Sequence, residues 1–158
     1  MIYIFFLWKK FHNIIEVISV KETKLYDEVI KEINYNFGDV FIFDGFIISE
    51  VKEGISFSWQ NHAKSITDDV FEFTKTKGDE LILISHRIHS YSVVPTDWLK
   101  FFGKSFNLKG YGVVSNNNLS LVNIVVENLF FKKRIRRFSS IEAAVQWAKN
   151  YELVESED

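Results

Sequence analysis

The stretch from Asp79 to Trp98 constrains the possible fold of this chain most. In it, a short apolar run is followed directly by a polar segment. Residues 81–84 form the apolar run, which is typical of a central strand covered on both faces. Open α/β sheets bind their ligands at the carboxyl ends of such strands. We therefore predict an exposed binding or interaction loop made of the polar and aromatic residues that follow: His86, Arg87, His89, Ser90, Tyr91, Ser92, Thr96, Asp97 and Trp98.

The size and composition of the chain indicate one globular domain. Its 158 residues are enough to bury about two thirds of the unfolded surface, and 47% of them are apolar. The net charge of −2 gives no global basic field for nucleic acid, so we expect no specific nucleic-acid partner. The absence of cysteine from the sequence excludes disulfides, thiolate ligands and a cysteine nucleophile. It also fits a reducing compartment, and we expect a cytoplasmic protein.

The first residues need separate treatment because residues 2–8 are apolar and are followed by Lys9 and Lys10. A secretory signal has its positive charge before the apolar core and a small-residue cleavage site after it, and this segment has neither. It is also much shorter than the roughly 20 residues of a membrane span. We expect residues 1–20 to be an extension, as a strand or a loose tail. Membrane-surface contact through residues 2–10 and an upstream start are the alternatives.

The first half of the proposed domain, which we place at residues 21–152, has the pattern of an antiparallel meander. A weak strand is predicted at 13–20, and residues 28–36 alternate between apolar and polar side chains as a half-exposed strand does. A tight turn is expected at 36–39. Residues 40–51 are β-prone and are interrupted by Asp44-Gly45, which the sequence leaves open as a hairpin turn or a bulge.

The second half alternates helices and strands. Ser58 is a candidate cap for a helix over 59–77, and its inward face would hold Ala63, Ile66, Val70, Phe73 and Lys77. Further helices are predicted from Thr96-Asp97 onwards, at 119–133 and at 141–151, and strands at 81–84, 111–115 and 135–138. Ser139 and Glu142 have the spacing of a capping box for the last helix. Its apolar stripe is the cleanest in the chain: Ile141, Ala144, Val145, Ala148 and Tyr151.

This order predicts an α/β fold: a mixed sheet with an antiparallel N-terminal meander, then alternating helices and strands, with about four helices. Residues 153–158 would be an acidic tail.

The element order and the ending LFFKKRIRRFSSIEAAVQWA, residues 129–148, resemble the STAS fold of anti-sigma-factor antagonists. The resemblance is greatest to the SpoIIAA-like branch of small bacterial proteins, which is similar in fold to CRAL-TRIO lipid-binding domains, and it covers residues 28–151. It implies a regulatory role without catalysis. In that family a serine is phosphorylated in an Asp-Ser-Ser-Gly-like turn. Residues 90–97 correspond to this turn here without its glycine, and the nearest hydroxyls are Ser92 and Thr96.

Two kinds of chemistry in the loop compete with simpler interpretations. His86 and His89 are three residues apart, which places them on opposite faces of a strand and disfavours a shared metal. His89, Ser92 and Asp97 could be combined as a hydrolase triad, although no nucleophile-elbow glycine pattern surrounds the serine. We therefore predict no catalytic residue, no metal and no cofactor.

A basic cluster stands near the end of the chain, and it has two interpretations. Cations at a helix C-terminus stabilise its dipole, and the same charges could form a patch for an anionic partner. The cluster is Lys132, Lys133, Arg134, Arg136 and Arg137.

The leading functional hypothesis is therefore a non-catalytic STAS-like regulatory or protein-interaction module with a protein partner, and a homodimer is compatible with it. The alternative is a carrier of a lipid-like or apolar small molecule. A cavity lined by phenylalanines would favour the carrier, whereas a filled core and an exposed loop would favour the interaction module; the candidate lining residues are Phe71, Phe73, Phe102 and Phe106. An enzyme of unknown reaction is the third hypothesis.

Overall fold

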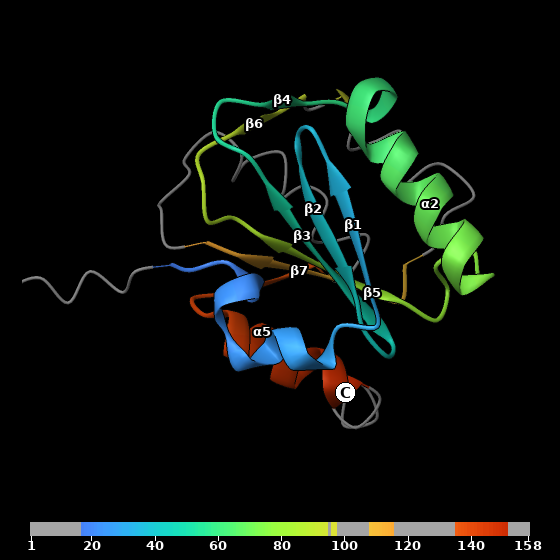
Figure 1. Ribbon diagram of the computed structural model, residues 1–158, viewed down its shortest axis with the longest axis vertical. Coiled ribbons are helices and arrows are strands. Elements are labelled where there is room, and N and C mark those ends of the chain that lie inside the picture. Colours follow the sequence, from blue (N-terminus) through green and yellow to red (C-terminus); the bar gives the residue numbers. More distant parts are fainter. Residues whose placement is uncertain (1–16, 95, 98–107, 116–134, 152–158) are drawn as a thin grey trace, which may run out of the picture.

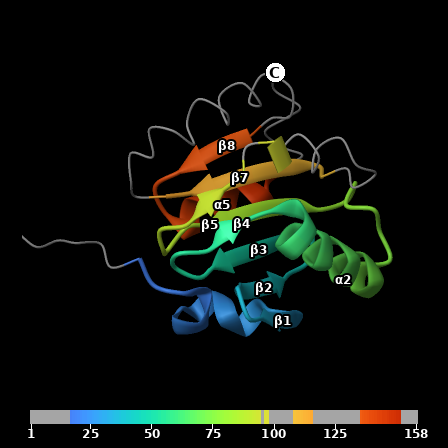
Figure 2. The same ribbon diagram turned by 90° about the horizontal axis from the view of Figure 1, so that it is seen from above.

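The computed structural model describes residues 17–94, 96–97, 108–115 and 135–151. A six-stranded sheet runs through this part of the chain (Figure 1). Its strands are β1 (Lys31–Tyr35), β2 (Gly38–Ile42), β3 (Phe46–Val51), β5 (Ile82–His86), β7 (Gly110–Val114) and β8 (Ile135–Phe138). They lie in this same order across the sheet (Figure 2). A separate pair consists of β4 (Ser56–Phe57) and β6 (Ser92–Val93).

The strand directions divide the large sheet into two parts. β1, β2 and β3 are antiparallel neighbours, whereas β3, β5, β7 and β8 are parallel. Tight turns can join antiparallel strands, whereas parallel strands need a crossover connection. The predicted α/β class, with its mixed sheet and antiparallel N-terminal meander, is confirmed.

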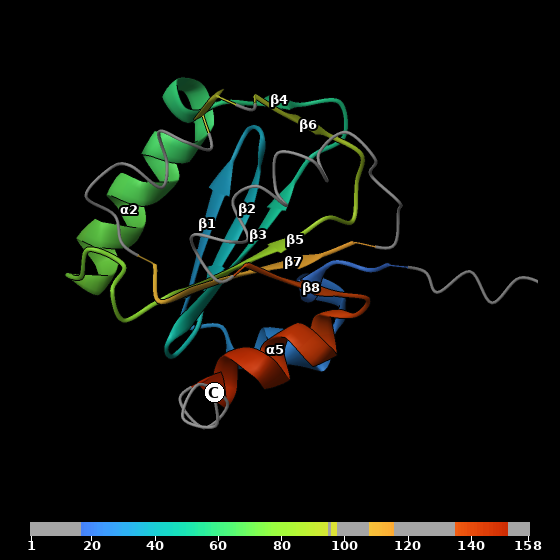
Figure 3. The same ribbon diagram turned by 180° about the vertical axis from the view of Figure 1, so that it is seen from behind.

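Helices lie against both faces of the sheet (Figures 1 and 3). α5 (Ile141–Lys149), with the 3-10 turns η1 (Val20–Glu22) and η2 (Lys24–Glu28), covers one face, and α2 (Lys64–Thr74) lies on the other. A π-helical turn, η3 (Trp59–Ala63), leads into α2. The described residues thus hold two α-helices, fewer than the four expected. The helix expected at 119–133 lies outside them, as does most of the one expected from Thr96.

Alternation along the strands gives each face its own core. On the α5 face, Phe46 and Ile48 of β3 and Ile82 and Ile84 of β5 pack with the helix. On the α2 face, Val40, Ile42, Ile47, Val70 and Leu81 form a smaller cluster. The predicted stripe of α5 is confirmed, since all five of its residues are buried.

The Asp44-Gly45 dipeptide is a hairpin turn. It joins β2 to β3, and the backbone N–H of Phe43 donates to the carbonyl of Phe46 at 2.9 Å. Gly45 has a φ of 80°, which glycine adopts without the steric cost of a side chain. The bulge alternative is therefore wrong, and the chain reverses fully at this point.

Two element predictions need correction. The strand expected at 13–20 is absent from its described part, residues 17–20, where Val20 begins η1 and packs into the core. The helix expected to reach Lys77 ends at Thr74, because Lys75 adopts a left-handed conformation with φ of 58°. Phe73, expected to face inward, is 44% exposed, and Phe71 is 42% exposed. Neither phenylalanine lies in the core.

The cap of α5 is one residue later than predicted. The Ser140 hydroxyl accepts from the backbone N–H of Ala143 at 3.2 Å, and Ser140 is the N-cap residue. Ser139 is exposed. The capping box of Ser139 with Glu142 is therefore wrong, although the helix start that it indicated is right.

We expect Ser140→Ala to lower the free energy of unfolding by about 1 kcal/mol, because it removes the acceptor for an N–H of the first turn. Ser139→Ala is the matched control and should change it by less than about 0.5 kcal/mol. Urea unfolding followed by circular dichroism measures both variants. Equal losses in the two would contradict the assignment of Ser140 as the cap.

Candidate functional site

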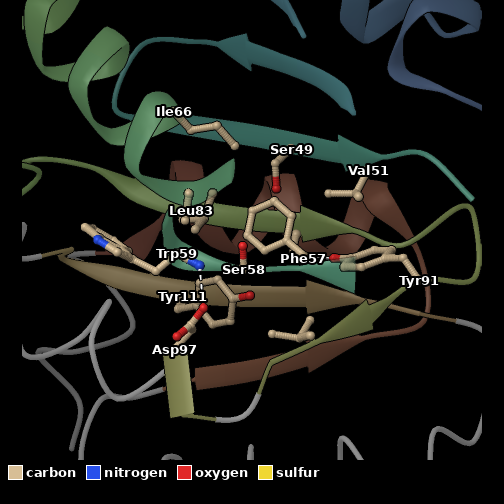
Figure 4. A pocket seen from close by; sticks show the side chains of 13 residues that line it. Ser49, Val51, Phe57, Ser58, Trp59, Ile66, Leu83, Tyr91, Asp97 and Tyr111 are labelled. Carbon is tan, nitrogen blue, oxygen red and sulfur yellow. Dashed lines mark hydrogen bonds between the residues drawn. The ribbon is translucent and has the colours of Figure 1, made fainter. Parts of the chain in front are cut away.

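A hollow opens on the α2 face of the sheet, towards the carboxyl ends of β3 and β5 (Figure 4). Its volume is about 60 Å³, enough for a few water molecules at about 10–15 Å³ each. Its floor belongs to the sheet, because residues two apart along a strand share a face. The floor residues are Ser49 and Val51 of β3, Leu83 and Ser85 of β5, and Tyr111 of β7.

The walls of the hollow come from segments outside the large sheet. The short pairing of β4 with β6 holds Phe57 beside Val93, and the rings of Phe57 and Tyr91 are 6.2 Å apart. Ala63 of η3 and Ile66 of α2 add apolar surface. The hollow is therefore mainly apolar, and its polar groups are few.

Asp97 ties the start of η3 to the edge of the hollow. Its carboxylate accepts from the backbone N–H of Trp59 at 2.7 Å, the bond drawn as a dashed line in Figure 4. The hydroxyl of Ser58 accepts from the N–H of Asn61, which confirms Ser58 as a cap. The Ser58 N–H donates to His62 Nδ1 at 2.9 Å. These bonds satisfy backbone groups that a helix start leaves without partners, so this wall is fixed.

Three hydroxyl groups meet at the floor. Ser85 Oγ and the Tyr91 hydroxyl are 3.0 Å apart, and the Tyr111 hydroxyl lies near Ser85 and Arg87, whose side chains lower its pKa slightly. Burial raises the pKa of Tyr111 well above its ordinary value, since the charged phenolate would be poorly solvated there. Tyr111 therefore keeps its proton at neutral pH and remains a hydrogen-bond donor.

Arg87 lies beside these three hydroxyl-bearing side chains. It follows β5 directly, and its backbone N–H donates to Val114 at 2.9 Å, so the strand alternation continues and Arg87 shares the face of Ser85. Its guanidinium stands over the Tyr91 ring, 5.0 Å from the centroid. The residue is only 7% exposed, and Nε and Nη2 are buried without a hydrogen-bond partner.

A second buried polar group lies on the opposite face, beneath η1. Glu50 Oε1 is 2.8 Å from His86 Nδ1 and accepts from the Val20 N–H at 2.8 Å. Glu50 Oε2 accepts from the Ser19 hydroxyl at 2.6 Å. Because a carboxylate oxygen can only accept, we assign a proton to Nδ1 of His86, which then donates to Glu50 Oε1. This cluster holds the N-terminal segment onto the sheet.

The structure separates the residues predicted for the loop. His86 lies inside β5, and both His86 and Arg87 are buried, so their placement in an exposed loop is wrong. Tyr91 and Asp97 are half-buried at the hollow. The exposed members are His89, Ser90, Ser92 and Thr96, and Trp98 lies outside the described residues.

The candidate chemistries of the loop are not assembled in the part of the chain that the structure describes. His86 bonds to Glu50, whereas His89 is exposed. Between His89 and Ser92 no side-chain hydrogen bond is formed, and the Asp97 carboxylate accepts from a backbone N–H. Within the described ranges, no group of three or more histidine or carboxylate side chains is placed to hold a metal ion.

Of the basic cluster, only the β8 residues can be placed. Arg136 is half-buried and Arg137 is exposed. Lys132, Lys133 and Arg134 lie outside the described residues, so the anionic-partner patch stays a prediction.

Sequence reasoning missed most of the hollow, including Ser49, Phe57, Trp59 and Tyr111. One signal was available: Ser49 is a polar residue within the β-prone segment 46–51. Its spacing of two from Val51 places both side chains on one face of the strand. The other contributions depend on which strands are neighbours, and no local pattern gives that.

In the ranges that the structure describes, no helix has the length and apolar character needed to cross a membrane. No family model, curated protein or solved structure matches this chain.

Proposed function

We propose that this chain is a non-catalytic, STAS-like binding module that takes a small organic molecule into the hollow on its α2 face. The antiparallel meander followed by parallel strands, with α5 on one face, supports the STAS-like part of the proposal. The observation that carries the binding role is the lining of the hollow, in which apolar walls surround a few converging polar groups. Ligand sites of proteins have this composition.

The position of the hollow agrees with the role. It lies towards the carboxyl ends of β3 and β5, where open α/β sheets bind ligands. A wider depression at the opposite ends of these strands is lined by charges of both signs, Glu28, Asp44, Glu80, Lys109 and Lys149. Such a rim is typical of a solvated surface and favours no organic ligand.

The size of the hollow limits the ligand. An engineered apolar cavity of about 150 Å³ encloses benzene, and this hollow is less than half as large. A bound molecule must therefore be small or must extend through the open mouth. A long acyl chain enclosed between helices and sheet does not fit this geometry, and the exposed Phe71 and Phe73 do not line the hollow.

Nuclear magnetic resonance titration with benzamide tests this proposal. We expect millimolar binding that shifts the amide signals of Ser49, Ser85 and Tyr111, because one edge of the ring would contact the floor of the hollow while the rest extends through its open mouth. Ser49→Leu should abolish the shifts, since its side chain fills the hollow, whereas Ser49→Ala keeps the space and should keep the shifts. Unchanged spectra of the wild type, or equal shifts in Ser49→Leu, would refute binding in the hollow.

A protein-interaction module is the second candidate, and one observation favours it. The loop with exposed His89, Ser90 and Ser92 is held to the body by three backbone bonds of 2.9–3.0 Å between residues 54–57 and 90–94. A fixed loop of this kind can present polar side chains to a partner. Native mass spectrometry of protein purified from its own host tests this role. A co-purifying protein that is lost in the Ser90→Asp, Ser92→Asp double variant would support it. Retention of that protein by the variant would exclude the loop.

A further inference from the structure

The buried arginine beside the hollow has donors that the described residues leave without partners. Arg87 is 93% buried, and none of the ion pairs formed within the described ranges includes it. The Tyr91 ring covers one face of the guanidinium, and Tyr111 lies close enough for the charge of Arg87 to lower its pKa. Nε and Nη2 remain. A buried cation with free donors is unfavourable unless an anion neutralises it.

The identity of the two free nitrogens indicates the chemistry of that anion. Nε–H and Nη2–H point the same way from one edge of the planar guanidinium. This edge matches the two oxygens of a carboxylate, which accept two parallel bonds in a bidentate pair. If only one donor were free, a water molecule would be a sufficient partner. Both donors of a single edge favour a planar, two-oxygen ligand.

The hollow and Arg87 share neighbours. Tyr91 and Tyr111 both line the hollow; the guanidinium of Arg87 stands over the Tyr91 ring, and its charge acts on Tyr111. Arg87 itself does not line the hollow. Tyr91 is half-buried, and a rotation of its side chain would open a path from the hollow towards Arg87. Such side-chain rotations are fast compared with ligand exchange.

We propose that the hollow binds a small organic carboxylate, with its two oxygens on Nε and Nη2 of Arg87 and its apolar body against Phe57 and Leu83. This inference rests on the proposed function, because it names the ligand class of the same hollow. The Tyr111 hydroxyl is placed to donate a further hydrogen bond to the anion. The apolar walls then select against hydrated inorganic anions.

The test compares benzoate with benzamide, which has the same shape without the charge. We expect the wild type to bind benzoate at least tenfold more tightly than benzamide in the resonance titration. Arg87→Met should remove this preference, because it keeps an unbranched apolar side chain and removes the charge and the paired donors. Arg87→Lys should retain only part of the preference, since a single ammonium lacks the paired edge. The exposed Lys31→Met is the charge-matched control and should bind as the wild type does.

The outcomes separate the two proposals. Failure of both probes to bind the wild type overturns the binding role of the hollow. Benzamide binding without a benzoate preference, or a preference that persists in Arg87→Met, overturns the carboxylate inference alone. Tighter binding of inorganic phosphate than of benzoate would also overturn it. If Arg87→Met does not fold, Arg87→Lys decides, and a full benzoate preference in that variant contradicts the paired-edge geometry.

Discussion

Glu50→Ala should lower the free energy of unfolding by about 3–5 kcal/mol, because it leaves several buried or half-buried donors without their acceptor, at about 1–3 kcal/mol each. The Glu50 carboxylate accepts from Ser19, Val20 and His86, and its side chain is only 4% exposed. Its loss leaves three buried or half-buried donors without an acceptor. For a domain of this size the melting temperature should fall by the order of 10 °C.

The matched control is Glu53→Ala, because Glu53 follows β3 closely and is exposed. It should change the free energy of unfolding by less than about 0.5 kcal/mol. Hydrogen exchange adds a local measurement: the Val20 amide should lose its protection in Glu50→Ala and keep it in Glu53→Ala. Similar stability of the two variants would show that the pair does not hold the N-terminal segment.

The Glu50 and His86 pair shows which part of the structure the sequence could not supply. Glu50 is the last residue but one of β3 and His86 is the last of β5, and alternation alone places Glu50 on the face of Phe46 and Ile48. Their contact depends on the parallel register in which Ser49 lies opposite Ser85. Because the sequence contains no local signal for strand neighbours, His86 was assigned to the loop that follows its strand.

Elements with a strong local period were predictable. α5 has an apolar stripe with helical spacing, and β1 alternates with a period of two, so the pattern within each segment determines its structure. The hollow has no such pattern, because its floor and walls come from β3, β5, β7, the β4–β6 pair and η3. The end of α2 was missed for a third reason: the left-handed conformation of Lys75 is rare for a residue other than glycine, asparagine or aspartate.

Trp147, the largest side chain of α5, packs against β7. Trp147 is 6% exposed and lies over β7 at the two glycines of that strand. A Cβ added at Gly112 would be 3.1 Å from Cζ3 of the indole, and one added at Gly110 would be 3.1 Å from Cη2. The glycines therefore let the helix approach the sheet closely. Phe138 and Tyr151 complete the packing, with ring centroids 5.2 and 5.4 Å from Trp147.

Trp147→Ala should lower the free energy of unfolding by about 3–5 kcal/mol through lost burial and the cavity it leaves. Gly112→Ala alone should cost about 1–3 kcal/mol, because the added methyl forces the indole away. In the Trp147→Ala background the same glycine substitution should change the stability by less than about 0.5 kcal/mol, since the preference for alanine over glycine in a strand then offsets the remaining contact with Phe138 Cε2, 3.3 Å from the added Cβ. Denaturant unfolding of the four proteins gives the interaction energy. Gln146→Ala, exposed on the same helix, is the control. Additive effects would mean that the indole does not set the distance between α5 and β7.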